Sequence, residues 1–540
     1  MGKHKGNLES RIFKAGVFVL IAHILFKLAG LIQAKVMGHY LPQTTFDVVY
    51  AFAFENCIFM LFLIGEEVLG PAFLPVFMRE LDIESEKSAW SFANTVLTLQ
   101  FILLVIVACV LSLAPSLAVN VLTHWRPDTT PEKYALATQS VRTLAPAVIG
   151  LSLGSTTYVL LNSYKRFFLA AFGDAVWKFA VVFFLFIGAV FAYDSAQVLM
   201  WGLVAGSLCK VGTHLFGLRD KLNRFRPEFA FSHPAFKRFC WLALPLLAGI
   251  LMAKVRDEVN NVYLLSALDQ SGLMQANSMG RKLQSTLLFL VPYTLSIAAF
   301  PFFCELVDRN DHQKLGDLVT RFGRMLLSVF APFSLFVAVA AVPFTSLIFK
   351  GGHFDAVAVQ RTAVSLACYT FVLPAAAIEA LVMQAFFANR RMLAVTLIGI
   401  LFSSLSILIS WVGLKVSDGR ELLLLAFIAG GFTLSRTFKS VALVEMLKKN
   451  APVFPFRQTV AFLLRVGLAA GLASGLSWLL LERVPMLAGL HGRTGDLIKL
   501  SVAGAAFGLV YLIAAYALRI SEIHELFTLL WKGRRRSRQS

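Results

Sequence analysis

Charged side chains lie inside long apolar stretches of this sequence, and they are the residues best placed to do chemistry. Each stretch has about 20 residues or more, which is enough to cross a hydrocarbon core of roughly 30 Å as an α-helix. A charge at mid-bilayer costs at least about 2.5–3.5 kcal/mol, so these side chains should face protein or a water-filled cavity. They are concentrated in the first, second, seventh and eighth stretches.

The cations of these stretches predict a site for phosphate groups. Guanidinium groups offer bidentate hydrogen-bond donors, and ammonium groups act as point charges. The predicted substrate-binding cations are Lys27, Arg256, Arg281 and Lys282.

The carboxylates of the same stretches are candidate groups for ion coupling or gating, because buried acids in membrane helices commonly carry protons or cations. Adjacent residues on a helix point in different directions, so Arg256 cannot pair with both acids that follow it. Gly65 and Gly70 flank Glu66 and Glu67. This pattern also fits a distorted helix turn, or a position of the two acids near the membrane interface. The candidates are Asp47, Glu55, Glu66, Glu67, Asp257 and Glu258.

Other membrane charges have structural explanations. Asp174 and Lys178 are spaced four residues apart, so we expect them to neutralise each other on one helix face. His214 is expected to be a hydrogen-bonded polar residue rather than a proton switch. Further cations are expected to lie near helix ends and extend to lipid head groups, namely Lys35, Arg142, Lys210 and Lys439.

Composition places the whole chain in a membrane. Of 540 residues, 58% are hydrophobic and 15% are charged, and the mean hydropathy is +0.72. The net charge of +19 is spread over short loops, which argues against nucleic-acid binding. The six cysteines are scattered without a CxxC pair, so we expect no disulfide, metal site or cofactor.

Hydropathy predicts an all-α polytopic protein with about fourteen transmembrane helices. Lys and Arg are far more frequent in the loops on the side of the two termini, which predicts cytoplasmic termini. The predicted spans lie near 12–37, 48–78, 92–122, 136–163, 167–193, 196–218, 238–265, 273–303, 325–349, 358–388, 392–414, 421–446, 458–481 and 496–519.

An internal repeat predicts the domain organisation. Phe73-Leu74-Pro75-Val76-Phe77 closes the second span, and Phe300-Pro301-Phe302-Phe303 closes the eighth in a similar way. Six spans separate them, which indicates two pseudo-symmetric six-helix lobes with a substrate site between them. The predicted domains are 1–226 (spans 1–6), 227–450 (spans 7–12), and 451–540 (spans 13–14 with a basic cytoplasmic tail). In the repeat register, Arg281 is equivalent to Glu55.

Two motifs resemble a known family. The run Gly65-Glu66-Glu67-Val68-Leu69-Gly70-Pro71-Ala72-Phe73-Leu74-Pro75-Val76-Phe77 resembles the second span of the MurJ (MviN) lipid II flippases. The run Phe349-Lys350-Gly351-Gly352-His353-Phe354 resembles the family's loop before span 10, and Gln384-Ala385-Phe386-Phe387-Ala388 resembles the end of that span. The resemblance covers nearly the whole chain.

The resemblance implies a multidrug/oligosaccharidyl-lipid/polysaccharide exporter fold, with two lobes around a cavity lined by cations and two extra helices that form a groove for a polyprenyl tail. Lys27 matches the first arginine of the family's span 1 pattern, and Gln33 replaces the second. Asp47 matches the family's acid after the first loop, and Arg281 or Lys282 matches the span 8 arginine. The family's span 2 arginines are absent near Met60, Leu61 and Phe62, so the chain is a divergent member.

The predicted function is therefore to flip an undecaprenyl-linked, lipid II-like precursor across the bacterial inner membrane by alternating access. Its expected partners are a polyprenyl-pyrophosphate-linked saccharide, membrane lipids and a coupling cation. The alternatives are a cation-coupled exporter of small molecules, a flippase for another lipid-linked glycan, and a scaffold that does not transport. An enzyme is not expected, because the far-side loops are short and lack clusters of catalytic acids.

Overall fold

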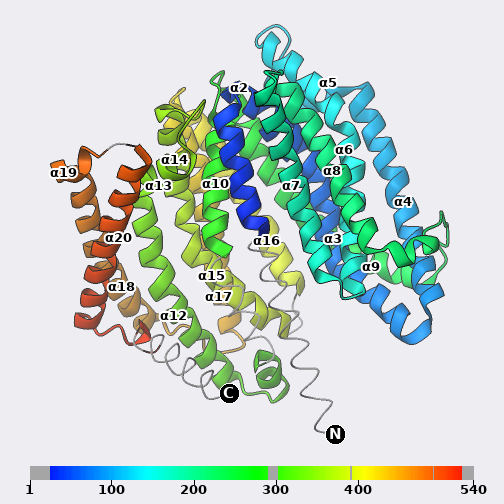
Figure 1. The fold of residues 1–540 in the computed structure, drawn as a ribbon. Helices are drawn as coiled ribbons and strands as arrows, with labels where there is room; N and C mark the ends of the chain where they lie inside the picture. Colours follow the sequence, from blue (N-terminus) through cyan, green and yellow to red (C-terminus); the bar gives the residue numbers. More distant parts are fainter. Residues whose placement is uncertain (1–24, 290–301, 389–391, 491, 524, 526–540) are drawn as a thin grey trace. The chain divides into compact units, whose positions relative to one another are not determined.

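The computed structural model of this chain describes residues 25–289, 302–388, 392–490, 492–523 and 525. This part of the chain is built from helices, whose order is shown in Figure 1. Eleven of the described helices are long and apolar enough to cross a membrane, or twelve if one bent helix is included. The predicted all-helical membrane fold is confirmed. The count of fourteen stays a prediction, because the first and eighth spans lie partly outside the described residues.

Contacts between residues divide the chain into two compact units. The first comprises Met1–Gln275 and Gly351–Phe354, and the second comprises Ala276–Lys350 and Asp355–Ser540. The boundary therefore falls inside helix α10 (Leu273–Phe289). The domain limits expected from the repeat, at residues 226 and 450, remain a prediction.

The first unit begins with a described helix over residues 25–40 and continues with a helical run over Gln43–Glu84. Thirteen residues of this run, η1 (Phe46–Ile58), are π-helical, a geometry that is rare and is often found at functional sites. The other elements of this unit are α2 (Gln43–Thr45), α3 (Phe59–Arg79), η2 (Glu80–Glu84), α4 (Glu86–Leu113), α5 (Pro115–Leu122), α6 (Pro131–Ser163), α7 (Phe167–Val190), α8 (Ser195–Gly217), η3 (Arg219–Arg224), α9 (Pro234–Glu258), η4 (Val259–Tyr263) and η5 (Leu265–Ala267).

The second unit contains most of α10 and a described helix over residues 302–308. Its other elements are α12 (His312–Val339), α13 (Ala341–Phe349), α14 (Ala356–Thr370), α15 (Val372–Ala388), α16 (Met392–Ser417), α17 (Glu421–Lys448), α18 (Phe456–Arg483), α19 (Pro485–Ala488) and α20 (Gly492–Ala517).

Prolines break two of the predicted spans. The span expected over 92–122 ends as α4 at Leu113, and a separate helix begins at Pro115. The span expected over 325–349 starts earlier, at His312, and breaks at Ala340. Pro115 and Pro343 have no N–H to donate to the carbonyl four residues earlier, which interrupts each helix. A hydropathy average does not detect this loss, because both sides of the break are apolar.

The span 2 motif forms the packing core of the first unit. Phe73 and Phe77 are fully buried, and their ring centroids lie 5.6 Å apart. Phe92 of α4 stacks on Phe73 at 5.0 Å, and Trp90 meets Phe77 edge-on. This part of the motif therefore holds α3 against α4.

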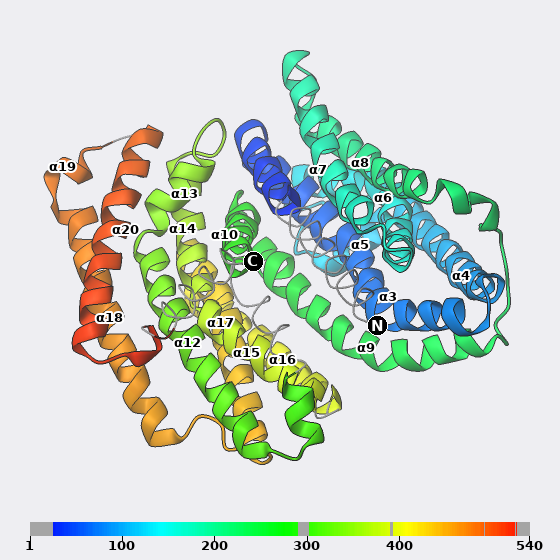
Figure 2. The same cartoon turned by 60° about the horizontal axis from the view of Figure 1, so that its bottom comes forward.

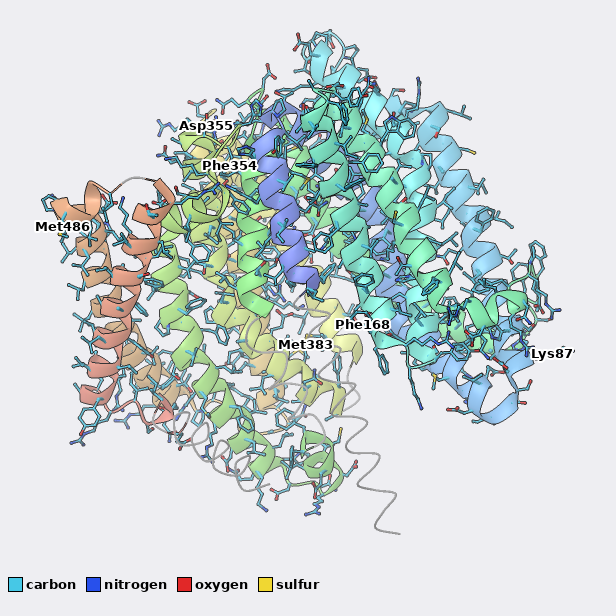
Figure 3. The ribbon with its side chains drawn as sticks, viewed as in Figure 1. Lys87, Phe168, Phe354, Asp355, Met383 and Met486 are labelled. Atoms are coloured by element: carbon cyan, nitrogen blue, oxygen red, sulfur yellow. The ribbon has the colours of Figure 1, made fainter. Side chains whose placement is uncertain are left out.

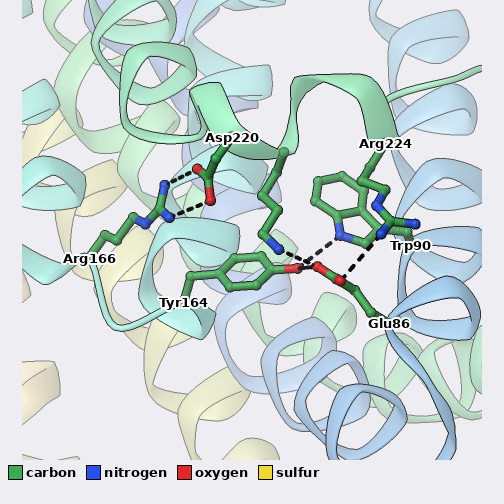
Figure 4. A network of polar contacts seen from close by, with 7 residues as sticks. Glu86, Trp90, Tyr164, Arg166, Asp220 and Arg224 are labelled. Atoms are coloured by element: carbon green, nitrogen blue, oxygen red, sulfur yellow. Dashed lines mark hydrogen bonds and ion pairs between the residues drawn. The ribbon is translucent and has the colours of Figure 1, made fainter.

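A network of polar groups joins α4 to the segments that follow α6 and α8 (Figure 4). Trp90 Nε1 donates to the Tyr164 hydroxyl at 2.9 Å, and that hydroxyl donates to Glu86 at 3.0 Å. Lys221 also donates to Glu86, at 2.5 Å. Burial, together with the Glu86 carboxylate, raises the pKa of Tyr164 to about 12. The phenol therefore stays protonated at neutral pH and continues to donate.

The last two spans pack together within the second unit. α18 and α20 lie side by side, and α12 lies against α18 (Figure 2). Small residues of α18, including Ala469 and Ala473, are fully buried at this contact. The Tyr511 hydroxyl of α20 donates to the Ser328 carbonyl of α12 at 2.5 Å. The helices expected to form an appended pair are thus packed on α12.

Large apolar side chains cover the outer faces of the helices. Phe168 of α7, labelled in Figure 3, is exposed, as are Phe172, Phe179 and Phe183 on the same helix. Exposed apolar faces of this extent would aggregate in water and are stable against lipid chains. The exposed surface is therefore that of a membrane protein.

Candidate functional site

Asp47 is bound by two backbone N–H groups of the first unit. Its carboxylate is buried at the start of η1 and accepts the backbone N–H of Gly272 at 2.6 Å and that of Gln275 at 2.8 Å. Gly272 directly precedes α10 and Gln275 lies in its first turn, where backbone donors lack partners within the helix. Asp47 thus caps α10 at its N-terminus.

The second motif contains a glycine loop, Gly351–Phe354, which belongs to the first unit. His353 donates its backbone N–H to the His39 carbonyl at 3.1 Å. Gly352 has φ +60, and a Cβ atom there would lie 2.1 Å from the His39 carbonyl oxygen. Only glycine fits this backbone and this close approach, which explains the Gly-Gly pair.

The charged end of α9 contains three of the predicted site residues. Arg256 and Asp257 form an ion pair at 2.7 Å, with each side chain about one-fifth exposed. Glu258 is buried, and neither of its carboxylate oxygens has a hydrogen-bond partner among the described residues. One turn earlier, Lys254 pairs with Glu67 of α3 at 2.6 Å.

Two further predicted residues of the first unit are half-buried. Lys27 lies on the helix over residues 25–40, and Glu55 lies in η1. Glu55 interacts electrostatically with the buried Tyr50 of the same segment. Gln33, which stands where the family has an arginine, is fully buried, and neither of its amide atoms has a hydrogen-bond partner among the described residues.

The predicted neutralisation of Asp174 by Lys178 is wrong. Asp174 pairs instead with Lys210 of α8 at 2.6 Å, while the Lys178 ammonium lies 3.2 Å from the centroid of the Phe26 ring. The expectation that Lys210 extends to head groups is also wrong, because its side chain is only 1% exposed. The Asp174–Lys210 pair depends on the packing of α7 against α8, which the spacing of residues along one helix does not reveal.

His214 is hydrogen-bonded, as predicted. One ring nitrogen, Nδ1, lies 2.9 Å from the Thr157 hydroxyl, and Nε2 lies 3.1 Å from the Ala170 carbonyl. The ring is fully buried beside Gly173, where a Cβ atom would lie 2.2 Å from Nε2. Nδ1 also lies 3.1 Å from the Gly154 carbonyl, so both ring nitrogens have polar contacts within the first unit.

The second unit holds a group of cations around one aromatic ring. Glu379 of α15, which is 5% exposed, accepts from both Arg436 and Lys439 of α17 at 2.8 Å each. The guanidinium groups of Arg281 and Arg436 lie 5.2 Å and 6.0 Å from the centroid of the Phe432 ring. One carboxylate neutralises only one of the two cations that contact it, so Glu379, Arg436 and Lys439 together carry a net positive charge.

Of the predicted cations, the group includes Arg281, and Lys282 follows it on α10. The expectation that Lys439 extends to head groups is wrong, because it pairs with Glu379, and the sequence pattern gives no role to Glu379 or Arg436. The signal in the sequence that could have identified Glu379 and Arg436 is the presence of a charged residue within an apolar helix. The pairing depends on contact between α15 and α17, which sequence spacing does not reveal.

An apolar groove of about 370 Å³ also lies in the second unit. Residues of α12, α15, α17 and α18 line it, with Pro374, Ile378 and Val441 among them. Glu445 and Lys448 are the charged residues of the lining. Its dimensions and apolar lining suit a hydrocarbon chain.

Comparison with known proteins identifies the family. The family model described as "Lipid II flippase MurJ" matches residues 14–491. This chain belongs to the MurJ family. Among MurJ relatives, the probable lipid II flippase of Borreliella burgdorferi is 22% identical over 402 residues, covering 74% of this chain and 77% of the relative. The lipid II flippase MurJ of Burkholderia cenocepacia is 23% identical over 392 residues, covering 70% of this chain and 74% of the relative.

Solved structures give the same fold. A lipid II flippase MurJ in an inward closed conformation aligns with a TM-score of 0.73 at 17% identity, covering 94% of this chain and 100% of that structure. An inward-facing multidrug transporter of the MATE family aligns with a TM-score of 0.64 at 12% identity, covering 81% of this chain and 97% of that structure. The predicted MurJ resemblance is therefore confirmed.

Proposed function

We propose that this chain flips lipid II, an undecaprenyl-linked cell-wall precursor, from the cytoplasmic to the outer leaflet of the bacterial inner membrane. The observation that carries the proposal is the MurJ family match over residues 14–491. Charged groups within apolar helices and a separate apolar groove support it, because an amphiphile needs an environment for its head and another for its tail. Alternating access is the expected mode of transport.

The pyrophosphate is proposed to bind cations of the membrane helices. Lys27, Arg256, Arg281 and Lys282 are the candidates from the sequence. The half-exposed Arg436 joins them, because Glu379 neutralises only one of the two cations that it contacts. Arginine suits this role, since its planar donors match phosphate oxygens.

The polyprenyl tail is proposed to lie in the apolar groove between α12, α15, α17 and α18. The lining residues Ile378 and Val441 offer apolar surface, and α18 is one of the two helices beyond the second predicted lobe. Glu445 and Lys448, the two charged residues of the lining, pair with each other at 2.5 Å, so the groove carries no net charge from them. A tail longer than the groove would extend along exposed apolar helix faces.

Both termini are proposed to be cytoplasmic. The proposed gating or ion-coupling groups remain Asp47, Glu55, Glu66, Glu67, Asp257 and Glu258. Glu258 is the strongest of these candidates, because its buried carboxylate lacks a hydrogen-bond partner among the described residues. Transport by this chain is proposed to involve no enzymatic step and no cofactor. The family match does not favour the alternative of a small-molecule exporter, since the MATE likeness concerns the fold.

Reconstituted protein tests the proposed function. Purified protein is placed in liposomes with fluorescent lipid II, with a fluorescent glycan on undecaprenyl monophosphate, or with a small cationic dye. Exchange of lipid II between leaflets, above that in empty liposomes and above that of the monophosphate lipid, is the expected result. Movement of the dye without lipid II exchange would contradict the proposal and favour the exporter.

A further inference from the structure

Charged side chains from four helices meet inside the first unit. They are Glu66 and Glu67 of α3, Asp174 of α7, Lys210 of α8 and Lys254 of α9. Glu66 interacts electrostatically with all four of the others. We call these residues the Glu66 cluster. Its position on membrane-crossing helices makes its net charge costly unless it is balanced.

The charges in the Glu66 cluster do not balance. Each ammonium has a close carboxylate partner, since Lys210 lies 2.6 Å from Asp174 and Lys254 lies 2.6 Å from Glu67. Glu66 is the third carboxylate, and no cation among the described residues lies within ion-pair distance of it. Three carboxylates and two ammonium groups leave one negative charge, so one more cation is required for neutrality.

The helices bury the Lys210 side chain of the cluster, which is 1% exposed, whereas the Glu67 side chain is 45% exposed. Lys210 crosses α6 at Gly154, where a Cβ atom would lie 2.9 Å from the lysine side chain. The Lys210 ammonium also lies 4.3 Å from the centroid of the Phe62 ring on α3, one turn before Glu66. The side chain is therefore directed from α8 toward α3, and Asp174 of α7 and Glu66 of α3 are alternative partners for its ammonium group.

The remaining titratable groups near Glu66 do not supply the missing charge. Tyr158 of α6 interacts with Glu66 and Asp174, but a phenol has no positive form. His214 of α8 is fully buried and lies one turn from the cationic Lys210, and both conditions disfavour a positive charge on its ring. Protonating His214 would place two cations side by side.

We infer that Glu66 is a proton-binding site of the first unit, whose proton is exchanged as Lys210 changes partner between Asp174 and Glu66. With the proton on Glu66, Lys210 pairs with Asp174, as in this structure. When the proton leaves, Glu66 becomes a carboxylate that competes for Lys210. A proton fits better than a metal ion, because two ammonium groups repel a cation and occupy carboxylate oxygens that it would need.

Infrared spectroscopy of the purified protein tests the proton itself. A protonated carboxyl has a C=O stretching band that shifts on exchange into heavy water. We expect the wild-type spectrum at neutral pH to contain such a band that Glu66→Gln lacks. Glu445→Gln, which removes an exposed acid, should keep it. An identical band in wild type and Glu66→Gln would overturn the inference.

Glu66→Asp is the control for a folding defect in Glu66→Gln, because it keeps a carboxyl group on a shorter side chain. A folded Glu66→Asp protein should regain the band at a shifted frequency, and absence of the band would count against the inference.

Coupling to transport rests on the proposed function and needs a second measurement. In proteoliposomes with a pH gradient, Glu66→Gln should equilibrate lipid II but lose gradient-driven accumulation. If wild-type protein moves no lipid II, the proposed function fails, and the infrared band still decides the proton site.

Discussion

The carboxylate of Asp47 accepts the backbone N–H of Gln275 at 2.8 Å, although the two residues are 228 positions apart. The contact joins the start of η1 to the first turn of α10, and the second carboxylate oxygen accepts Gly272 N–H at 2.6 Å. A negative charge at this end of a helix also interacts favourably with the helix dipole. Asp47 therefore stabilises α10 through two backbone donors and its charge.

Asp47→Ala should lower the free energy of unfolding by about 1–2 kcal/mol, because it removes a helix cap. Asp47→Asn should lose less, since its carbonyl oxygen can still accept one of the two hydrogen bonds. Reversible unfolding in mixed detergent micelles measures both changes. The exposed Asp128→Ala is the matched control, and equal stability of Asp47→Ala and the control would refute the role of Asp47.

The sequence predicted the helical membrane fold because apolar runs of this length have few other stable states. It also identified the family, since the glycine and phenylalanine motifs have strict local requirements at Gly352 and Phe73. It did not predict the partners of Asp174 and Glu379. Those ion pairs join different helices, and their geometry depends on how the helices pack rather than on spacing along one helix.

Glu379→Ala should destabilise the second unit, because it leaves Arg436 and Lys439 without their common carboxylate. Loss of one partner of a buried pair costs about 3–5 kcal/mol, and partial exposure of the two cations reduces this to about 2–3 kcal/mol. Unfolding in mixed micelles measures the loss. Glu445→Ala, which breaks an exposed pair with Lys448, should change stability by less than about 1 kcal/mol. Equal losses in the two variants would contradict burial of Glu379.

Gly352→Ala should destabilise the first unit or displace its glycine loop. An alanine Cβ would lie 2.1 Å from the His39 carbonyl oxygen at a φ of +60, and such strain costs about 1–3 kcal/mol. Gly430→Ala on α17 is the control, because no atom lies within 4 Å of a Cβ built there. A lower unfolding temperature for Gly352→Ala alone is expected. Unchanged stability and unchanged protease resistance of the loop would show that this close contact does not form.

The Arg166–Asp220 pair in Figure 4 should persist in moderately acidic solution. Arg166 donates to Asp220 at 2.8 Å and lowers the pKa of that carboxyl to about 2. A lowered folded-state pKa contributes stability that is fully present above the unfolded value of about 3.9 and is lost as pH falls through the folded value. Wild type and Asp220→Asn should thus differ in unfolding temperature at pH 6 and converge below about pH 2. A difference that disappears already at pH 5 would contradict the lowered pKa.

The proposed role of the cations in lipid II transport is tested most directly by neutralising Arg281 and Lys282 together and measuring lipid II exchange in proteoliposomes. Each charge-assisted hydrogen bond contributes about 1.5–3 kcal/mol, so loss of even one should slow exchange by about 10-fold or more. Arg309→Gln, at an exposed arginine, is the matched control. The account predicts slow exchange in the double variant and wild-type exchange in the control, with equal protein in both membranes. Wild-type exchange by the double variant would contradict the account.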